Sequence, residues 1–144
     1  MKRNIRFLEE MDAFASELLP TLSEGGVLAL EGELGSGKTT FVKSLGRALG
    51  VRTIVRSPTF TLLNVHKTAH PTIKFLVHID LYRFLDNPTS TLVHEIGLDE
   101  WMDRDDALIA IEWPLPEVAG LFSGFKTIRF RYVNDTVREV FIDE

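Results

Sequence analysis

Hydrophobic residues spaced three or four apart predict two helices in this chain. The first covers residues 9–19, where one face carries Met11, Phe14, Ala15, Leu18 and Leu19. The second begins near residue 40, and its apolar stripe consists of Phe41, Val42, Leu45, Ala48 and Leu49. Gly50 follows that stripe, at the place where a glycine commonly ends a helix. A weaker helical pattern covers residues 89–102 and is interrupted by Gly97.

Short apolar or alternating runs predict the strands, at residues 5–8, 27–30, 61–65, 75–79, 107–111, 127–133 and 137–142. The connection between the third and fourth runs is too short for a helical crossover, which predicts an antiparallel pair. Asn134 and Asp135 separate the last two runs and predict a β-hairpin at the C-terminus. The whole pattern predicts an α/β fold, a single domain over residues 1–144 with a mixed central sheet flanked by helices.

The composition narrows the class of protein. With 144 residues, 44% of them hydrophobic, the chain is long enough for one domain with a sizeable core. It contains no cysteine, which excludes disulfides and thiolate metal sites and agrees with a reducing compartment. No apolar run is long enough to span a membrane, and the first residues lack a signal-peptide pattern. We therefore expect a cytoplasmic protein without a membrane partner.

The charge of the chain bears on nucleic-acid binding. A net charge of −5 argues against a broad basic face that would grip a polynucleotide. We expect no DNA partner, and we expect any polynucleotide in the function to be held by another protein.

One loop carries the strongest chemical signal. Residues 32–40, GELGSGKTT, stand between the apolar run 27–30 and the second helix and match G-x-x-x-x-G-K-[ST]. The glycines let backbone N–H groups turn toward a phosphate. Lys38 then supplies a positive charge to the β- and γ-phosphates, and the hydroxyl of Thr39 is a candidate Mg²⁺ ligand at the helix N-terminus. The loop predicts a P-loop NTPase domain.

Two carboxylates at strand ends are candidates for the metal and for water. Asp80 ends the run 75–79, where a P-loop protein needs an acid that holds Mg²⁺ through its water shell. Glu112 ends the run 107–111 and could orient water or complete the Mg²⁺ shell. The plainer alternatives are a turn residue for Asp80 and a solvent-facing charge for Glu112.

Several other side chains have more than one interpretation. A hydroxyl of Ser57 or Thr59, beside Pro58, could reach Mg²⁺ or the γ-phosphate as switch loops do. Trp113 is a candidate for the core, for a lid or for a partner contact.

The arginines that could neutralise phosphate charge are Arg83 and Arg138, whereas Arg129 and Arg131 fit the solvent side of a strand. The four histidines show no metal-ligand spacing, so we interpret them as structural or solvated.

The missing motifs bear on the reaction. The sequence has no N-K-x-D segment, which favours ATP over GTP, and no arginine-rich lid of the kind that small-molecule kinases close over two substrates. Hydrolysis of ATP is therefore the leading hypothesis. The alternatives are a small-molecule kinase and a binding module that uses ATP without hydrolysing it.

Taken together, GELGSGKTT, SPTFTL, HIDLYRF and IEWP, in this order, resemble the TsaE (YjeE) family of tRNA threonylcarbamoyladenosine biosynthesis over nearly the whole chain. The resemblance implies a Mg²⁺-dependent ATPase, slow alone, that supports modification of adenosine 37 in tRNAs reading codons that begin with A. It also implies docking on a TsaB–TsaD heterodimer, with tRNA reached only through that complex and the transfer itself performed elsewhere.

The resemblance assigns roles to residues by matching motifs. The implied catalytic residues are Lys38, Asp80, Glu112 and the switch-type Thr59. The implied nucleotide contacts are Gly32, Leu34, Gly35, Ser36, Gly37, Lys38, Thr39, Thr40 and, from the C-terminal hairpin, Arg138. The implied Mg²⁺ ligands are Thr39, Asp80 and Glu112, and Trp113 is the partner or lid candidate. Two positions depart from the family pattern: His66, where relatives often have tyrosine, and Leu115, where an acidic or amide residue is common.

Overall fold

The computed structural model describes residues 1–22, 25–52, 63–82, 97–101, 104–114, 118 and 125–142. Thr59, Arg83 and Leu115 lie outside the described residues, and so does most of the helix expected at 89–102. The part of that helix within the described residues is a short 3-10 helix, η3, at Leu98–Glu100.

Seven strands form one mixed sheet, which confirms the predicted fold class. The strands are β1 (Lys2–Ile5), β2 (Gly26–Gly32), β3 (Leu63–Lys67), β4 (Phe75–Asp80), β5 (Ala107–Glu112), β6 (Lys126–Tyr132) and β7 (Arg138–Ile142). Their order across the sheet is β1-β7-β6-β2-β5-β4-β3. The four inner strands β6, β2, β5 and β4 are parallel, while β3, β7 and β1 pair antiparallel with their neighbours. The predicted antiparallel pair, β3 and β4, and the predicted C-terminal hairpin, β6 and β7, are both present.

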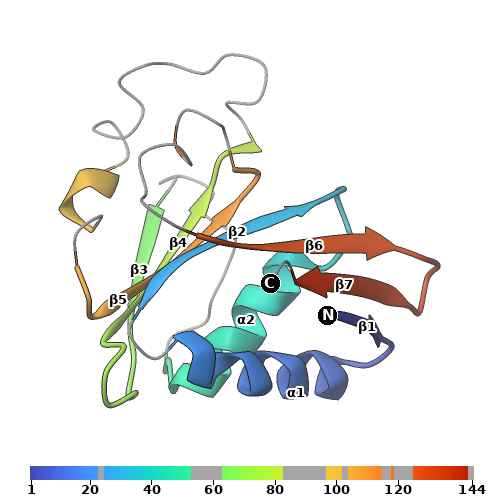
Figure 1. The fold of residues 1–144 in the computed structure, drawn as a ribbon, viewed down its shortest axis with the longest axis horizontal. Helices are drawn as coiled ribbons and strands as arrows, with labels where there is room; N and C mark the ends of the chain where they lie inside the picture. The colour runs from blue at the N-terminus through green and yellow to red at the C-terminus, as the bar shows by residue number, and fades with distance from the viewer. Residues whose placement is uncertain are drawn as a thin grey trace.

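Helices α1 (Leu8–Leu18) and α2 (Lys38–Leu49) pack side by side on the same face of the sheet (Figure 1). Both have the apolar stripe expected from the sequence, and a 3-10 turn, η1 (Leu19–Leu22), follows α1. The rings of Phe14, Phe41 and Phe130 join α1, α2 and β6, with centroids 5.6 Å apart in each neighbouring pair. Helix α2 ends at Gly50, whose φ of 77° is the left-handed conformation expected of a glycine that ends a helix.

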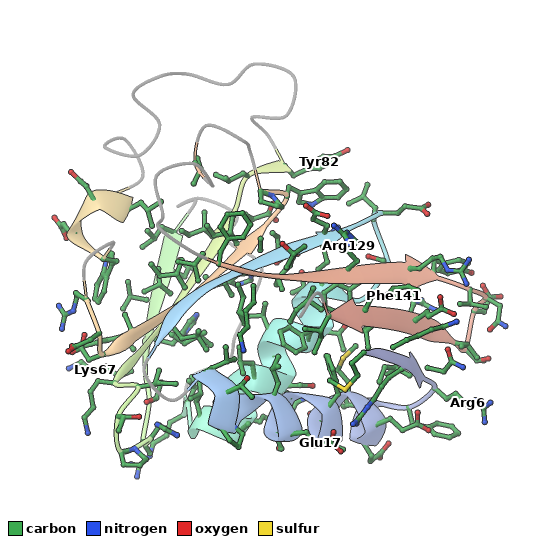
Figure 2. All side chains as sticks on the ribbon, in the orientation of Figure 1. Arg6, Glu17, Lys67, Tyr82, Arg129 and Phe141 are labelled. Carbon is green, nitrogen blue, oxygen red and sulfur yellow. The ribbon has the colours of Figure 1, made fainter. Side chains whose placement is uncertain are left out.

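Successive side chains along a strand point to opposite faces of the sheet, and the apolar ones form a separate core on each face. On β4, Leu76 belongs to the core under the helices, while Val77 and Ile79 belong to the core on the opposite face. Leu98 and Val118 pack into this second core. Glu17 on α1 and Lys67 at the end of β3 are exposed charged side chains at the periphery (Figure 2).

The predicted strand at residues 5–8 is wrong. The strand in this region is β1, Lys2–Ile5, which pairs with β7, and Leu8 already begins α1. Ile5 is buried, whereas Phe7 and Leu8 are 65% and 52% exposed, so only the first residue of the apolar run enters the core. The strand expected at 61–65 is Leu63–Lys67 within the described residues. The other predicted strands have ends within one or two residues of the observed ones.

Candidate functional site

The loop of residues 32–37 joins the end of β2 to the first residue of α2. A Cβ atom on Gly32 would lie 2.5 Å from the carbonyl oxygen of Phe130 and 2.6 Å from Ser36 Oγ, so only glycine fits there. Gly37 immediately precedes α2 with φ 110°, and no side chain caps the helix. Ser36 Oγ is buried and has no hydrogen-bond partner among the described residues. The loop therefore presents uncapped backbone and hydroxyl donors, which fits the phosphate cradle expected from its sequence.

Lys38 lies at the base of this loop and is only 5% exposed. Its Nζ donates to the carbonyl oxygens of Gly32 and Glu33 and lies 3.5 Å from the centroid of the Trp113 ring. Burial lowers the pKa of Lys38, and the negative charges of Glu112, Asp80 and Glu33 act in the opposite direction. The ammonium is thus held by acceptors and by an aromatic face within reach of the loop.

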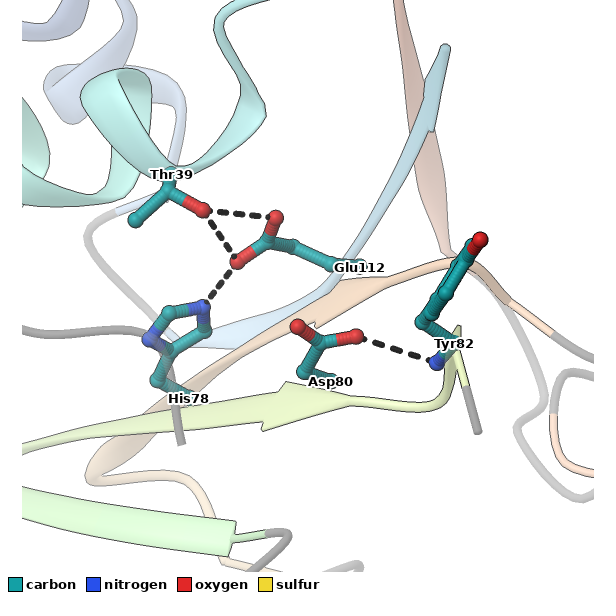
Figure 3. A network of polar contacts seen from close by, with 5 residues as sticks. All are labelled: Thr39, His78, Asp80, Tyr82 and Glu112. Atoms are coloured by element: carbon teal, nitrogen blue, oxygen red, sulfur yellow. Dashed lines mark hydrogen bonds and ion pairs between the residues drawn. The ribbon is translucent and has the colours of Figure 1, made fainter. Parts of the chain in front are cut away.

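A buried hydrogen-bond network connects α2, β4 and β5 (Figure 3). Thr39 Oγ1 lies 2.9 Å and 3.0 Å from the two carboxylate oxygens of Glu112. His78 Nε2 lies 2.5 Å from Glu112 Oε2. His78 is fully buried and Glu112 is 3% exposed, so the carboxylate is placed by two side chains rather than by water.

Asp80 stands beside Glu112 because β4 and β5 are parallel neighbours in which these two residues are in register. One oxygen of Asp80 accepts a hydrogen bond from the backbone N–H of Tyr82 at 3.0 Å. The sheet thus brings both predicted acids to the edge where Thr39 begins α2. The alternative of a solvent-facing Glu112 is wrong, since its side chain is buried.

These oxygen donors suit Mg²⁺ bound together with a nucleotide. A hydroxyl and two carboxylates are hard ligands of the kind that Mg²⁺ prefers, with phosphate oxygens and water completing its shell. No group of three or more His, Asp or Glu side chains that could hold a metal by itself occurs in the part of the chain that the structure describes.

A cavity of about 650 Å³ extends from this cluster to the N-terminal segment and the C-terminal hairpin. Arg138 lines it, and the Nε of Arg138 donates to the carbonyl oxygen of Gly35 at 2.9 Å. The predicted arginine of the hairpin therefore contacts the loop. Ile5, Leu8 and Met11 also line the cavity, and none of them was predicted to belong to the site.

Trp113 forms part of the wall beside Lys38. Its φ of 60° is a left-handed conformation that non-glycine residues rarely adopt. Its backbone N–H donates to the carbonyl oxygen of Leu30 at 3.3 Å, and its ring centroid lies 5.1 Å from that of Tyr82. The indole packs against the apolar core on one side and faces the cavity on the other.

The structure thus brings together most of the predicted site. The loop residues 33–40, Asp80, Glu112, Trp113 and Arg138 line one cavity, and Gly32 lies directly beside it. Thr59, the remaining predicted catalytic residue, lies outside the described residues. His78 was not predicted as a site residue, although it stands two residues before Asp80 on the same face of β4, a spacing that could have indicated its position.

The chain resembles known proteins over most of its length. The family model for the threonylcarbamoyl adenosine biosynthesis protein TsaE matches residues 5–140. The tRNA threonylcarbamoyladenosine biosynthesis protein TsaE of Aquifex aeolicus is 44% identical over 110 residues, covering 72% of this chain and 80% of that protein. The protein of the same name from Streptomyces coelicolor is 37% identical over 137 residues, covering 90% of this chain and 85% of that protein.

Two further comparisons concern length and fold. The Mycobacterium tuberculosis protein of that name is 36% identical over 107 residues, and the match spans 64% of that longer relative. The crystal structure of Bacillus subtilis YdiB superposes with a TM-score of 0.70 at 29% identity, covering 99% of this chain and 83% of that one.

Proposed function

This chain belongs to the TsaE family of tRNA threonylcarbamoyladenosine biosynthesis, and from that premise we propose that it is a Mg²⁺-dependent ATPase acting on a TsaB–TsaD complex. One observation carries the proposal. The glycine loop, Lys38 and Thr39 meet two strand-end carboxylates, Asp80 and Glu112, in one cavity.

The cavity has complementary surfaces for the two ends of ATP. The loop, the N-terminus of α2 and Lys38 offer N–H groups and positive charge to the phosphates. Arg138 adds a second cation beside Gly35. Phe7 and Leu8, which line the cavity and are 65% and 52% exposed, supply an apolar surface of the kind that packs on a purine base.

Thr39, Asp80 and Glu112 would hold Mg²⁺, which when bound supplies charge neutralisation on the transferring phosphate. The residues of the chain contribute positioning and electrostatics. Lys38 stabilises negative charge on the phosphate oxygens, and the two carboxylates provide acceptors for a water molecule. We assign the switch-type role to Thr59 from the family motif alone.

In this proposal, the ATP cycle changes how this chain docks on TsaB–TsaD and does not modify a small molecule. The chain carries a net charge of −5, which suits a subunit that leaves tRNA binding to its partners. Adenosine 37 is then modified by the complex, and ATP hydrolysis by this chain supports its turnover.

A second candidate is a binding module that uses ATP without hydrolysing it. Its support is the engagement of Glu112 by both Thr39 and His78, which takes up about two of the four acceptor positions of the carboxylate. This candidate predicts tight ATP and partner binding without release of phosphate.

The experiment is ATP turnover by the purified chain, with and without TsaB–TsaD. We expect slow hydrolysis that the complex accelerates. Lys38→Ala and Glu112→Ala should each reduce turnover on the order of 100-fold or more, because each removes a charge from the reacting end of the cavity. Lys126→Ala removes an exposed lysine at the start of β6 and should leave turnover unchanged. Full activity in both site variants would refute the proposal.

A further inference from the structure

His78 is a polar side chain buried on a face of the sheet that is otherwise lined by apolar residues. Its side chain is fully buried on β4, between Leu76 and Asp80 on the helix-covered face of the sheet. His78 Nε2 lies 2.5 Å from Glu112 Oε2. A buried polar side chain at such a position costs free energy unless its hydrogen bonds are made, so the contact with Glu112 explains why it is tolerated.

The direction of this hydrogen bond depends on the tautomer of His78. A carboxylate that binds Mg²⁺ can only accept, so the role proposed for Glu112 places the proton on His78 Nε2. His78 Nδ1 has no hydrogen-bond partner in the portion of the chain that the structure describes. Among those residues, the contact with Glu112 is therefore the hydrogen bond that orients the imidazole.

The two donors to Glu112 come from elements of different kinds. Thr39 is the second residue of α2, directly after the glycine loop, whereas His78 lies within β4, which is paired on both sides by β3 and β5. β4 is held by backbone hydrogen bonds along both edges. His78 therefore holds the carboxylate from the sheet.

We propose that His78 is a positioning residue, which holds the Glu112 carboxylate toward Thr39 and away from Lys38. This inference rests on the proposed ATPase function and adds a residue to it. The negative charge of Glu112 acts on Lys38, so the two groups attract one another across the site. Without the donor on His78, Glu112 turns toward the ammonium, and two groups needed at the phosphates neutralise each other instead.

Two amide variants test the position of the donor. The side-chain nitrogen of His78→Gln reaches the place of Nε2, while that of His78→Asn reaches only the place of Nδ1. Neither variant titrates, and both keep a polar side chain of similar size. We expect His78→Asn to raise the Mg²⁺ concentration that half-saturates nucleotide binding about 10-fold or more, and to lower kcat by a similar factor. His78→Gln should recover most of both losses.

Two measurements keep the inference separate from the proposed function. Long-range ¹H–¹⁵N spectra of the metal-free chain should show His78 protonated at Nε2, and protonation at Nδ1 alone would overturn the inference. In a Glu112→Ala background, His78→Asn should change the half-saturating Mg²⁺ concentration less than about 2-fold, because the group it positions is already gone. Independent effects, or equal effects of Asn and Gln, would also overturn it.

Failure of the proposed function has a different signature. A wild-type chain that releases no phosphate with TsaB–TsaD contradicts the ATPase proposal, while the Mg²⁺ titration and the spectra still decide the role of His78. Thermal unfolding of both amide variants shows whether either loss reflects misfolding.

Discussion

At the scale of single residues, the site depends on backbone conformations and contacts that few side chains allow. Gly32 combines a φ of 155° with a Cβ position already occupied by the backbone of β6 and the hydroxyl of Ser36. Trp113 holds a left-handed φ next to Lys38. Strained backbone of this kind persists where surrounding contacts fix it, and it concentrates at functional sites.

Gly32→Ala tests the first of these positions. The added Cβ would collide with the Phe130 carbonyl, so we expect a loss of about 3 kcal/mol of unfolding free energy in urea titrations, together with weaker nucleotide binding. Gly26→Ala is the matched control: Gly26 has φ 120°, but nothing lies within 4 Å of its Cβ. It should lose only about 1 kcal/mol from backbone strain. Equal losses in the two variants would show that the contact with β6 does not matter.

The residues of the loop and the two acids could be predicted because their signals are local. Gly32, Lys38 and Thr39 belong to one short motif, and Asp80 and Glu112 each end an apolar run. The role of His78 could not be predicted in this way, since it follows from the register between β4 and β5, more than thirty residues apart. The four histidines lack the spacing of metal ligands, and for that reason we interpreted His78 as structural or solvated.

At the scale of elements, α1 and α2 are joined by an exposed charged pair in addition to their apolar contact. Arg47 on α2 donates to Asp12 Oδ1 on α1 from both Nε, at 3.1 Å, and Nη2, at 2.6 Å. Hydrogen bonds from Arg47, and secondarily from Ser44, hold the pKa of Asp12 below its ordinary value. The pair connects the helix that carries the loop to the helix beside the apolar end of the cavity.

This pair predicts a pH dependence. Because the pKa of Asp12 is lower in the folded chain than in the unfolded chain, its stabilisation is present above about pH 4 and is lost as the pH falls through the folded value. Asp12→Asn should therefore lower the Tm at pH 7, by an amount corresponding to about 0.2–1 kcal/mol for an exposed pair. The difference from wild type should shrink as the pH falls below about 4.

The control for this measurement is Glu9→Gln, which removes a carboxylate from the same helix without disrupting the Asp12–Arg47 pair. Its Tm difference should be smaller than that of Asp12→Asn at pH 7. A wild-type advantage over Asp12→Asn that persists undiminished at pH 3 would contradict the assignment to the Asp12 charge.

Element types were easier to predict than element ends and order. Apolar spacing gave both helices and most strands, because these patterns are set by local periodicity. The first strand was misplaced since Phe7 and Leu8 extend an apolar run but face outward near the cavity. The placement of β6 beside β2 was not predictable, because it pairs segments almost one hundred residues apart.

At the scale of the whole molecule, the sheet order explains why the cavity is built from both ends of the chain. β2 lies at the centre of the sheet, and the loop after it faces the ends of β4 and β5 on one side and the β6–β7 hairpin on the other. β1 pairs with β7, which brings Ile5 and Arg138 to the same cavity. None of the described helices is long and apolar enough to cross a membrane.

The proposed function requires that this cavity bind Mg²⁺–ATP. Isothermal titration of the purified chain with ATP, in the presence and absence of Mg²⁺, measures that directly. We predict one site per chain, tighter with Mg²⁺, weakened on the order of 100-fold in Lys38→Ala and unchanged in Lys126→Ala. Binding of equal affinity in wild type and Lys38→Ala, or no binding by wild type, would contradict it.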